Sequence, residues 1–305
     1  MKKTIIQLFF LILIQSSFLS QLIAESNQEA RFQENIKDSK SALVLDLASS
    51  KFNLDLLTKE FANYDVLVVG EEHNDERGHE ISLKIFQELS TKYPLTLSLE
   101  MLEWHQQETT NEFLSGSISE SAFLNDSKYW NNFQKDYLPL VRWAKDNQIP
   151  VICANPPRRY ANALARQGFS AYKNFPKNER LYPLPQNLLR DRNSIYEAKL
   201  RDLFQGHSSQ ASIENTILAQ NFWDAGMTEK IASHQLISSR KIFHLNGRFH
   251  SDYGLGLTYR LRKAGIRTLT LTLLPEEVKT EGERKIADFV IFTNKPILKE
   301  DGKSD

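Results

Sequence analysis

Two short segments of the sequence share the spacing Gly-x-x-His, from Gly70 to His73 and from Gly247 to His250. A glycine permits a sharp turn or a close backbone approach, and a histidine three residues later can point back over the edge where the turn begins. A neutral imidazole in that position can bind a metal, accept a proton, or contact a haem iron or propionate. The two segments are therefore the first candidates for the chemistry of this protein.

Each segment follows an apolar run that predicts a buried strand, at residues 65–69 and 241–246, and similar runs occur at 95–99 and 150–154. In parallel α/β sheets, ligands bind beyond the carboxyl ends of the strands. Polar or ionisable residues end or follow all four predicted strands, namely Glu72 with His73, Glu100, Asn155, and His250. We therefore expect one site at one edge of the sheet.

Glutamate and histidine are common transition-metal ligands, so Glu72 and His73 are candidates, although neither HExxH nor HxxEH occurs in the chain. Their neighbours Glu71, Asp75 and Glu76 are interpreted as solvated residues near a helix start, where acidic side chains suit the helix dipole.

Glu100 ends an apolar strand, and a buried carboxylate must be paired or protonated. It would orient His73 or bind a metal; the alternative is a cap for the following helix. Tyr253 carries a phenol, which is a known type of haem-iron ligand. The alternative interpretation of Tyr253 is a core aromatic residue whose hydroxyl has a hydrogen-bond partner.

The run Arg158-Arg159-Tyr160 could meet an anionic group such as a propionate, with Arg159 as the candidate; the alternative is a solvated helix face. His244 lies inside a predicted strand and is interpreted as a core histidine. No role is assigned to the remaining histidines of predicted helix or loop surfaces, His105, His207 and His234.

Strand and helix patterns alternate along the chain, which predicts a mostly parallel sheet with helices on both faces. Long helical insertions at 106–145 and 192–238 could cap one edge, and a helix is expected at about 253–264. Residues 170–190 hold three prolines and are interpreted as a long surface loop or lid. No GxGxxG, P-loop or GxSxG motif occurs.

The start of the chain has the basic, apolar and small-residue order of a signal peptide, here residues 1–24. A flexible lead-in (25–45), a single α/β domain (46–296) and a flexible tail (297–305) are expected to follow. The only cysteine, Cys153, lies in a strand pattern, so we expect no lipobox cysteine and no internal disulfide. These features predict an exported protein of the periplasm or cell envelope.

Lysine plus arginine and aspartate plus glutamate number 38 each, so no global field attracts nucleic acid. A set of motifs in fixed order resembles the ChaN-like haem-binding uptake family over roughly residues 50–293. The segments that carry the resemblance are Gly70–His73, Ser98–Met101, Tyr137–Val141, Ala154–Tyr160, Gly247–His250, Asp252–Gly254 and Ala287–Thr293.

The resemblance implies an α/β domain that binds haem and acts in haem-iron acquisition, in the periplasm or at the outer membrane, with other haem-uptake components as partners. Haem contacts would come from His73, His250, Tyr253 and Arg159, supported by Glu72, Glu100, Asn155, Gly70 and Gly247. Because haem is large and flat, two copies of the chain could share it as a homodimer.

The wider group includes erythromycin esterases and Tiki-type metalloproteases, which share the two Gly-x-x-His segments. The alternative function is therefore a hydrolase of esters or peptides, with His73 or His250 as general base. Such a hydrolase could also be metal-dependent, with a divalent metal held by Glu72, His73, Glu100 and His250. A non-catalytic envelope partner protein is the third hypothesis.

Overall fold

The computed structural model describes residues 43–44, 54–126, 128–174, 188, 190–204, 210–275 and 285–293. The chain divides into two compact units, and of the first, Met1–Ser41 with Lys279–Lys285, only Lys285 is described. Every described helix and strand belongs to the second, Ala42–Val278 with Ile286–Asp305. The predicted signal peptide, the tail, His207 and all of the lead-in except residues 43–44 lie outside the described residues.

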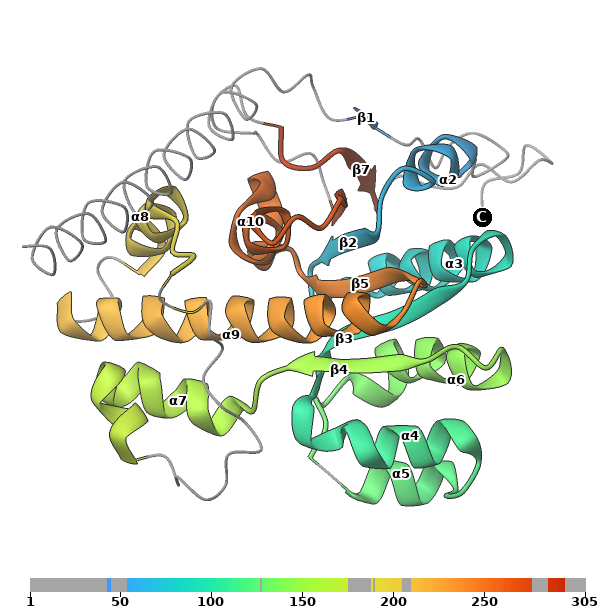
Figure 1. Cartoon of the computed structure of the whole chain (residues 1–305), viewed down its shortest axis with the longest axis horizontal. Coiled ribbons are helices and arrows are strands. Elements are labelled where there is room, and N and C mark those ends of the chain that lie inside the picture. The colour runs from blue at the N-terminus through green and yellow to red at the C-terminus, as the bar shows by residue number, and fades with distance from the viewer. Residues whose placement is uncertain are drawn as a thin grey trace, which may run out of the picture. The chain divides into compact units, whose positions relative to one another are not determined.

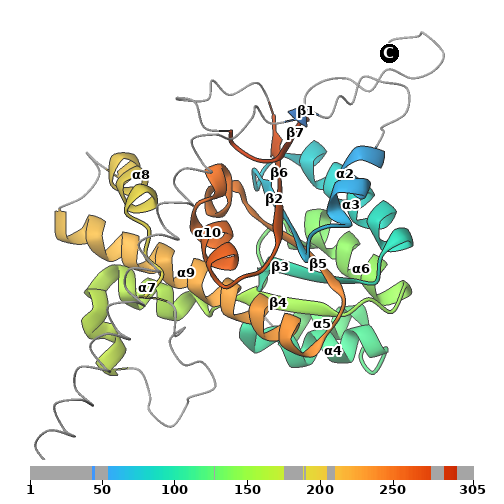
Figure 2. The same cartoon turned by 45° about the horizontal axis from the view of Figure 1, so that its top comes forward.

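The described strands form one parallel sheet in the order β1-β7-β6-β2-β5-β3-β4 (Figures 1 and 2). They are β1 (Leu43–Val44), β2 (Val66–Glu71), β3 (Leu95–Glu103), β4 (Val151–Asn155), β5 (Lys241–Gly247), β6 (Thr268–Leu274) and β7 (Phe289–Phe292). The predicted α/β class with a mostly parallel sheet is confirmed.

Successive side chains of each strand face opposite sides of the sheet, and a separate apolar cluster covers each side. Leu67 and Val69 face the larger cluster, and Val66 and Val68 the smaller one. The helices over the larger cluster are α2 (Asp55–Phe61), α3 (Glu76–Lys92), α4 (Gln107–Ser115), α5 (Glu120–Asp126) and α6 (Leu138–Asp146), and those over the smaller are α9 (Gln210–Ile237) and α10 (Gly256–Lys263).

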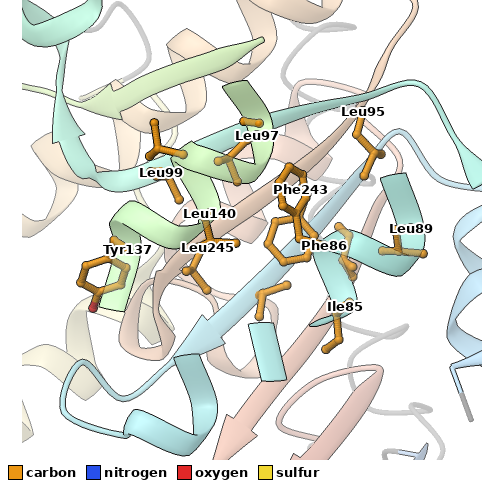
Figure 3. Packing of buried hydrophobic residues seen from close by; sticks show 14 of the residues in the cluster. Ile85, Phe86, Leu89, Leu95, Leu97, Leu99, Tyr137, Leu140, Phe243 and Leu245 are labelled. Atoms are coloured by element: carbon orange, nitrogen blue, oxygen red, sulfur yellow. The ribbon is translucent and has the colours of Figure 1, made fainter. Parts of the chain in front are cut away.

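Aromatic and aliphatic side chains fill the larger cluster between sheet and helices (Figure 3). Phe243 of β5 packs on Phe86 of α3 with ring centroids 5.2 Å apart. Helices α4 to α6 of the predicted insertion at 106–145 therefore lie over a face of the sheet, while the segment between α5 and α6 reaches its carboxyl edge.

The second predicted insertion does extend beyond the strand ends (Figure 1). Helix α9 has 28 residues, so it is about 42 Å long at 1.5 Å per residue. Met227 and Ile231 in its second half cover the sheet, whereas its first half packs on α7 (Arg158–Gln167) and α8 (Ser194–Phe204). Helices α7 and α8 and the first half of α9 therefore form a helical layer beside the carboxyl ends of the strands.

Two predicted boundaries differ from the structure at this edge. Strand β3 continues through Glu100 to Glu103, with a register shift against β4 between Leu99 and Glu103. The helix expected from 253 begins only at Gly256, after two 3-10 turns, η4 (Arg248–His250) and η5 (Asp252–Gly254). The expected loop at 170–190 begins with the 3-10 segment η3 (Gly168–Asn174), and most of its remainder lies outside the described residues.

Candidate functional site

The pairing of β2 with β5 brings the two Gly-x-x-His segments together, because Gly70 aligns with Asn246 and Glu71 with Gly247. Both glycines allow a neighbouring residue to pack directly against their backbone. A Cβ added at Gly70 would lie 2.7 Å from Ser251 Oγ, and one at Gly247 would lie 2.5 Å from His73 Nε2. Gly247 has a φ of −57°, so contact with His73, and not an unusual backbone angle, is what excludes a larger residue there.

The buried carboxylate of Glu71 contacts the imidazole of His73. His73 Nδ1 lies 3.2 Å from Glu71 Oε1, while the imidazole side chain remains 40% exposed. This pairing fixes the ring and leaves Nε2 on the side of Gly247 and the site. The interpretation of Glu71 as a solvated residue is wrong: it is the last residue of β2, 1% exposed, because the strand continues past Gly70.

Glu71 also contacts two groups from neighbouring elements. Tyr137 of the π-helical turn η2 (Phe133–Tyr137) donates its hydroxyl to Glu71 Oε1 at 2.6 Å, and His79 Nε2 of α3 lies 3.3 Å from Oε2. Burial is the largest influence on the pKa of Glu71 and raises it, but contacts with His73, His79 and Tyr137 outweigh burial and lower the pKa. The carboxylate behind His73 is therefore ionised.

The pKa of His73 is raised by the same geometry. Burial is the largest single influence and lowers the pKa of His73. The hydrogen bond to Glu71 and the charges of Glu100 and Glu71 together outweigh burial and raise it. The pKa of His79 is likewise raised: burial is the largest influence and lowers it, but the side-chain contact with Glu71, the charge of Glu71 and the charge of Asp136, 3.5 Å from Nδ1, outweigh burial.

His250 is only 7% exposed and lies between two carboxylates. Its Nδ1 lies 2.7 Å from Asp224 Oδ1 of α9, and its Nε2 lies 3.6 Å from Glu100 Oε1. Burial lowers the pKa of His250, but the charges of Glu100 and Asp224 raise it to about 9. His250 is therefore a buried imidazolium at neutral pH, and both of its nitrogens face carboxylates.

Glu100 links the two segments: its Oε2 accepts the Gly247 N–H at 2.7 Å, and its Oε1 faces His250. It is 6% exposed within β3, so the alternative of a helix cap is not observed. Glu72 turns to the rim, where its Oε1 accepts from Arg248 Nε at 2.5 Å; Arg248 also pairs with Asp252.

The predicted metal set of Glu72, His73, Glu100 and His250 does not converge. Among the described residues, no group of three or more histidine, cysteine, aspartate or glutamate side chains has the geometry to hold a metal ion. The physical reason is that the ligands are already paired: Glu72 with Arg248, and His250 with Asp224 and Glu100.

An aromatic and a cation lie next to His73. The Trp130 ring contacts the imidazole edge to face, with centroids 4.8 Å apart, and the Arg158 guanidinium carbon lies 5.5 Å from the Trp130 centroid. At the end of β4, Asn155 is 4% exposed and its Oδ1 has no hydrogen-bond partner among described residues. Arg159 is exposed on α7, with its guanidinium 4.8 Å from the Tyr160 centroid.

Tyr253 has a left-handed φ of 61°, and its backbone N–H donates to Ile286 O at 2.7 Å. Its ring packs with two apolar clusters, one involving α8 and the other involving Ile286, and Lys199 Nζ lies 4.4 Å from its centroid. The ring is half-buried, and both interpretations of Tyr253, a haem-iron ligand and a core aromatic, stay predictions.

Sequence reasoning missed four residues of this arrangement: His79, Trp130, Tyr137 and Asp224. Trp130, Tyr137 and Asp224 lie far from the strand ends in sequence, and His79 lies in the helix that follows β2, so inspection of the residues directly after each strand does not find them. A polar residue on an otherwise apolar helix face, such as Asp224 between Phe222 and Ala225, was the available signal.

The other histidines agree with the sequence interpretation where they are described. His244 is fully buried, bonds Ser98 Oγ at 2.9 Å, and has its pKa lowered to about 3, chiefly by burial. His105 has a side chain 34% exposed, and His234 Nε2 lies 3.0 Å from Thr96 Oγ1.

Comparisons with known proteins identify the family of the chain. The sequence profile described as "Haem-binding uptake, Tiki superfamily, ChaN" matches residues 57–261. The chain belongs to this family. The resemblance inferred from the motifs is thereby confirmed, although no curated protein matches the chain significantly.

Among solved structures, ChaN of Campylobacter jejuni, whose description is cofacial haem binding, shares 17% identity at a TM-score of 0.59. The match covers 81% of this chain and 94% of that one, and it shows a common fold. An erythromycin esterase mutant in its open conformation matches with 10% identity, a TM-score of 0.46 and 77% of each chain covered.

Proposed function

We propose that this ChaN-family protein binds haem at the carboxyl edge of its sheet, with His73 as the iron ligand. The half-exposed imidazole of His73 carries this proposal: its Nδ1 is engaged by an ionised carboxylate, and its Nε2 is turned to the site. A histidine held in this way is the usual form of a metal-ligating imidazole. Bound haem would supply an iron centre for storage or transfer.

The other donors fit haem. Trp130 offers a flat aromatic surface beside His73, and the exposed Arg158 and Arg159 offer cations for propionates. His250 is a poor iron ligand, because its charged ring is enclosed by Asp224 and Glu100. Its role is to hold Glu100, and through Glu100 the Gly247 backbone, against His73.

Hemin titration of the purified protein tests the proposal. We expect a saturable Soret shift that His73→Ala weakens at least tenfold, while Tyr253→Phe leaves it unchanged. His234→Gln is the matched control, because His234 contacts Thr96 near the amino end of β3. A wild-type protein with no saturable Soret change would refute haem binding, and an unchanged His73→Ala protein would refute the ligand assignment.

We also propose that the protein acts in the cell envelope, in haem-iron acquisition with other uptake components. The uptake description of the family and the signal-peptide pattern of residues 1–24 support this placement. No helix in the described part of the chain is long and apolar enough to cross a membrane. Fractionation of cells that express the full chain or a version without residues 1–24 tests export, and equal cytoplasmic retention of both would contradict it.

One observation keeps the hydrolase alternative in view. Two carboxylate–histidine pairs, Glu71 with His73 and Asp224 with His250, flank Glu100, an arrangement that general acid–base catalysis can use. The charged His250 would be an acid, and His73 or Glu100 the base. An ester and peptide screen decides this: turnover lost in both His73→Ala and His250→Ala, without hemin affinity, would replace haem binding as the function.

A further inference from the structure

His79 of α3 is a buried histidine to which the proposed function gives no task. It is 4% exposed and contacts the other oxygen of the Glu71 carboxylate, because His73 faces Oε1 and His79 faces Oε2. The second nitrogen of the His79 ring, Nδ1, lies 3.5 Å from Oδ2 of Asp136, whose side chain is 8% exposed. A continuous line of contacts therefore leads from the exposed imidazole of His73 through Glu71 and His79 to Asp136.

The two oxygens of Glu71 are held unequally. Oε1 accepts from the Tyr137 hydroxyl at 2.6 Å and lies 3.2 Å from His73 Nδ1. Oε2 forms no well-directed hydrogen bond with any described residue, and the side chain that faces it is His79, whose Nε2 lies 3.3 Å away. The terminal torsion of a glutamate side chain is broad, so partners on one oxygen alone leave the carboxylate free to turn. The contact between His79 and Oε2 is therefore what fixes the plane of the carboxylate.

Charge supplies the attraction in this contact. An imidazole carries a donor on each nitrogen only when it is charged, and both nitrogens of His79 face carboxylates. Burial is the largest influence on the pKa of His79 and lowers it, but the contact with Glu71 and the charges of Glu71, Asp136 and Asp75 raise it overall. The Tyr137 ring packs against the same imidazole, with centroids 5.0 Å apart. The positive ring thus attracts Oε2, while Asp136 holds it from its other nitrogen.

A fixed Glu71 carboxylate has a consequence for His73. The hydrogen bond that one ring nitrogen of a histidine makes determines which nitrogen carries the proton. Oε1 in a fixed position accepts from Nδ1–H, which leaves the lone pair of Nε2 for the site. We infer that His79 is a positioning residue, which orients the Glu71 carboxylate and thereby sets the Nδ1–H tautomer of His73. This inference rests on the proposed function for its effect on hemin affinity, whereas the tautomer is a property of the ligand-free protein.

NMR of the ligand-free protein with isotope-labelled histidine reports this tautomer, at the lowest pH at which the His73 ring is neutral. We expect the Nδ1–H form in wild type and a mixture of both forms in His79→Leu. His79→Gln should restore most of the Nδ1–H form, because its amide can donate to Oε2. The matched control His234→Leu removes a partly buried imidazole of α9 that contacts Thr96, and it should match wild type. If His79→Leu does not fold, Asp136→Asn decides, and it should show the same mixture.

Hemin titration of the same proteins adds the functional readout. We expect His79→Leu to bind hemin about three- to tenfold more weakly, less than removal of a direct partner of a ligating histidine costs, and His79→Gln to bind it nearly as wild type does. An unchanged tautomer in His79→Leu, or in Asp136→Asn where the leucine variant does not fold, would overturn the positioning role even if hemin binding weakened. A wild-type protein that binds no hemin, but whose His73 tautomer depends on His79, would overturn haem binding and support the positioning role.

Discussion

His250 lies between Asp224 and Glu100, and its charge makes a testable contribution to stability at the scale of one residue. Its pKa rises from 6.5 to about 9 on folding, so the folded protein binds an extra proton between these values. This stabilisation is fully present below pH 6.5 and is lost as the pH rises to 9; the shift corresponds to about 3 kcal/mol at most. The raised pKa values of His73 and His79 act in the same direction.

We therefore expect the free energy of unfolding in urea to fall between pH 6.5 and pH 9. His250→Gln should be less stable at pH 6.5 and should show a clearly flatter pH dependence. His105→Gln, at a side chain 34% exposed, is the control and should keep the wild-type slope. A His250→Gln protein with the full wild-type slope would contradict the buried imidazolium.

The two glycines of the repeated motif predict different outcomes for the same substitution. At Gly247 an alanine Cβ would meet the movable imidazole of His73, so Gly247→Ala should lose hemin affinity while unfolding within about 1 kcal/mol of wild type. At Gly70 the Cβ would lie 2.9 Å from the backbone Cα of Arg248, so Gly70→Ala should destabilise the fold by about 1–3 kcal/mol. Hemin titration and urea unfolding of both proteins test this, and unchanged hemin affinity in Gly247→Ala would contradict it.

At the scale of elements, apolar periodicity predicts the core strands and most helices, because β2, β5 and the first part of β3 are buried on both faces. It also places His73, Glu100 and His250 at one edge. It fails where a polar residue continues an element, as Glu71 and Glu100 do inside strands. Those carboxylates are tolerated there because Tyr137, Gly247 N–H and two histidines satisfy them, and all of these partners except His73 are distant in sequence.

Helix α9 supplies Asp224 to the site, and its position depends on a close contact at Gly226. A Cβ at Gly226 would lie 2.6 Å from Pro156 Cγ, in the connection from β4 to α7. Alanine improves helix propensity by about 1 kcal/mol, but overpacking against a rigid proline costs about 1–3 kcal/mol.

We expect Gly226→Ala to be destabilised by about 1 kcal/mol overall and to bind hemin more weakly, since α9 and Asp224 shift together. Ser233→Ala, at an exposed position of the same helix, is the matched control and should be as stable as wild type or slightly more stable. Urea unfolding and hemin titration measure both effects. A Gly226→Ala protein more stable than wild type would show that α9 does not need this close contact.

At the scale of the whole molecule, the sheet edge joins groups with separate tasks. Lysine plus arginine equal aspartate plus glutamate at 38 each, so no overall charge draws in an anionic ligand. Recognition must then depend on local cations at the rim, such as Arg158, and on the flat surface of Trp130. One exposed imidazole beside one aromatic ring leaves the opposite face of a bound porphyrin uncovered by these residues.

That uncovered face leads to the last prediction. Haem is large and flat, so a second copy of the chain can cover the face that the first copy leaves open. If His73 supplies one iron ligand per chain, sharing of this kind brings two chains together, because burying the flat apolar surfaces favours association. Light scattering should show hemin raising the particle mass toward twice 35.2 kDa. The shift should be absent in His73→Ala and present in His234→Gln. Saturable hemin binding by particles that keep the mass of one chain would exclude the shared arrangement while leaving the His73 site intact.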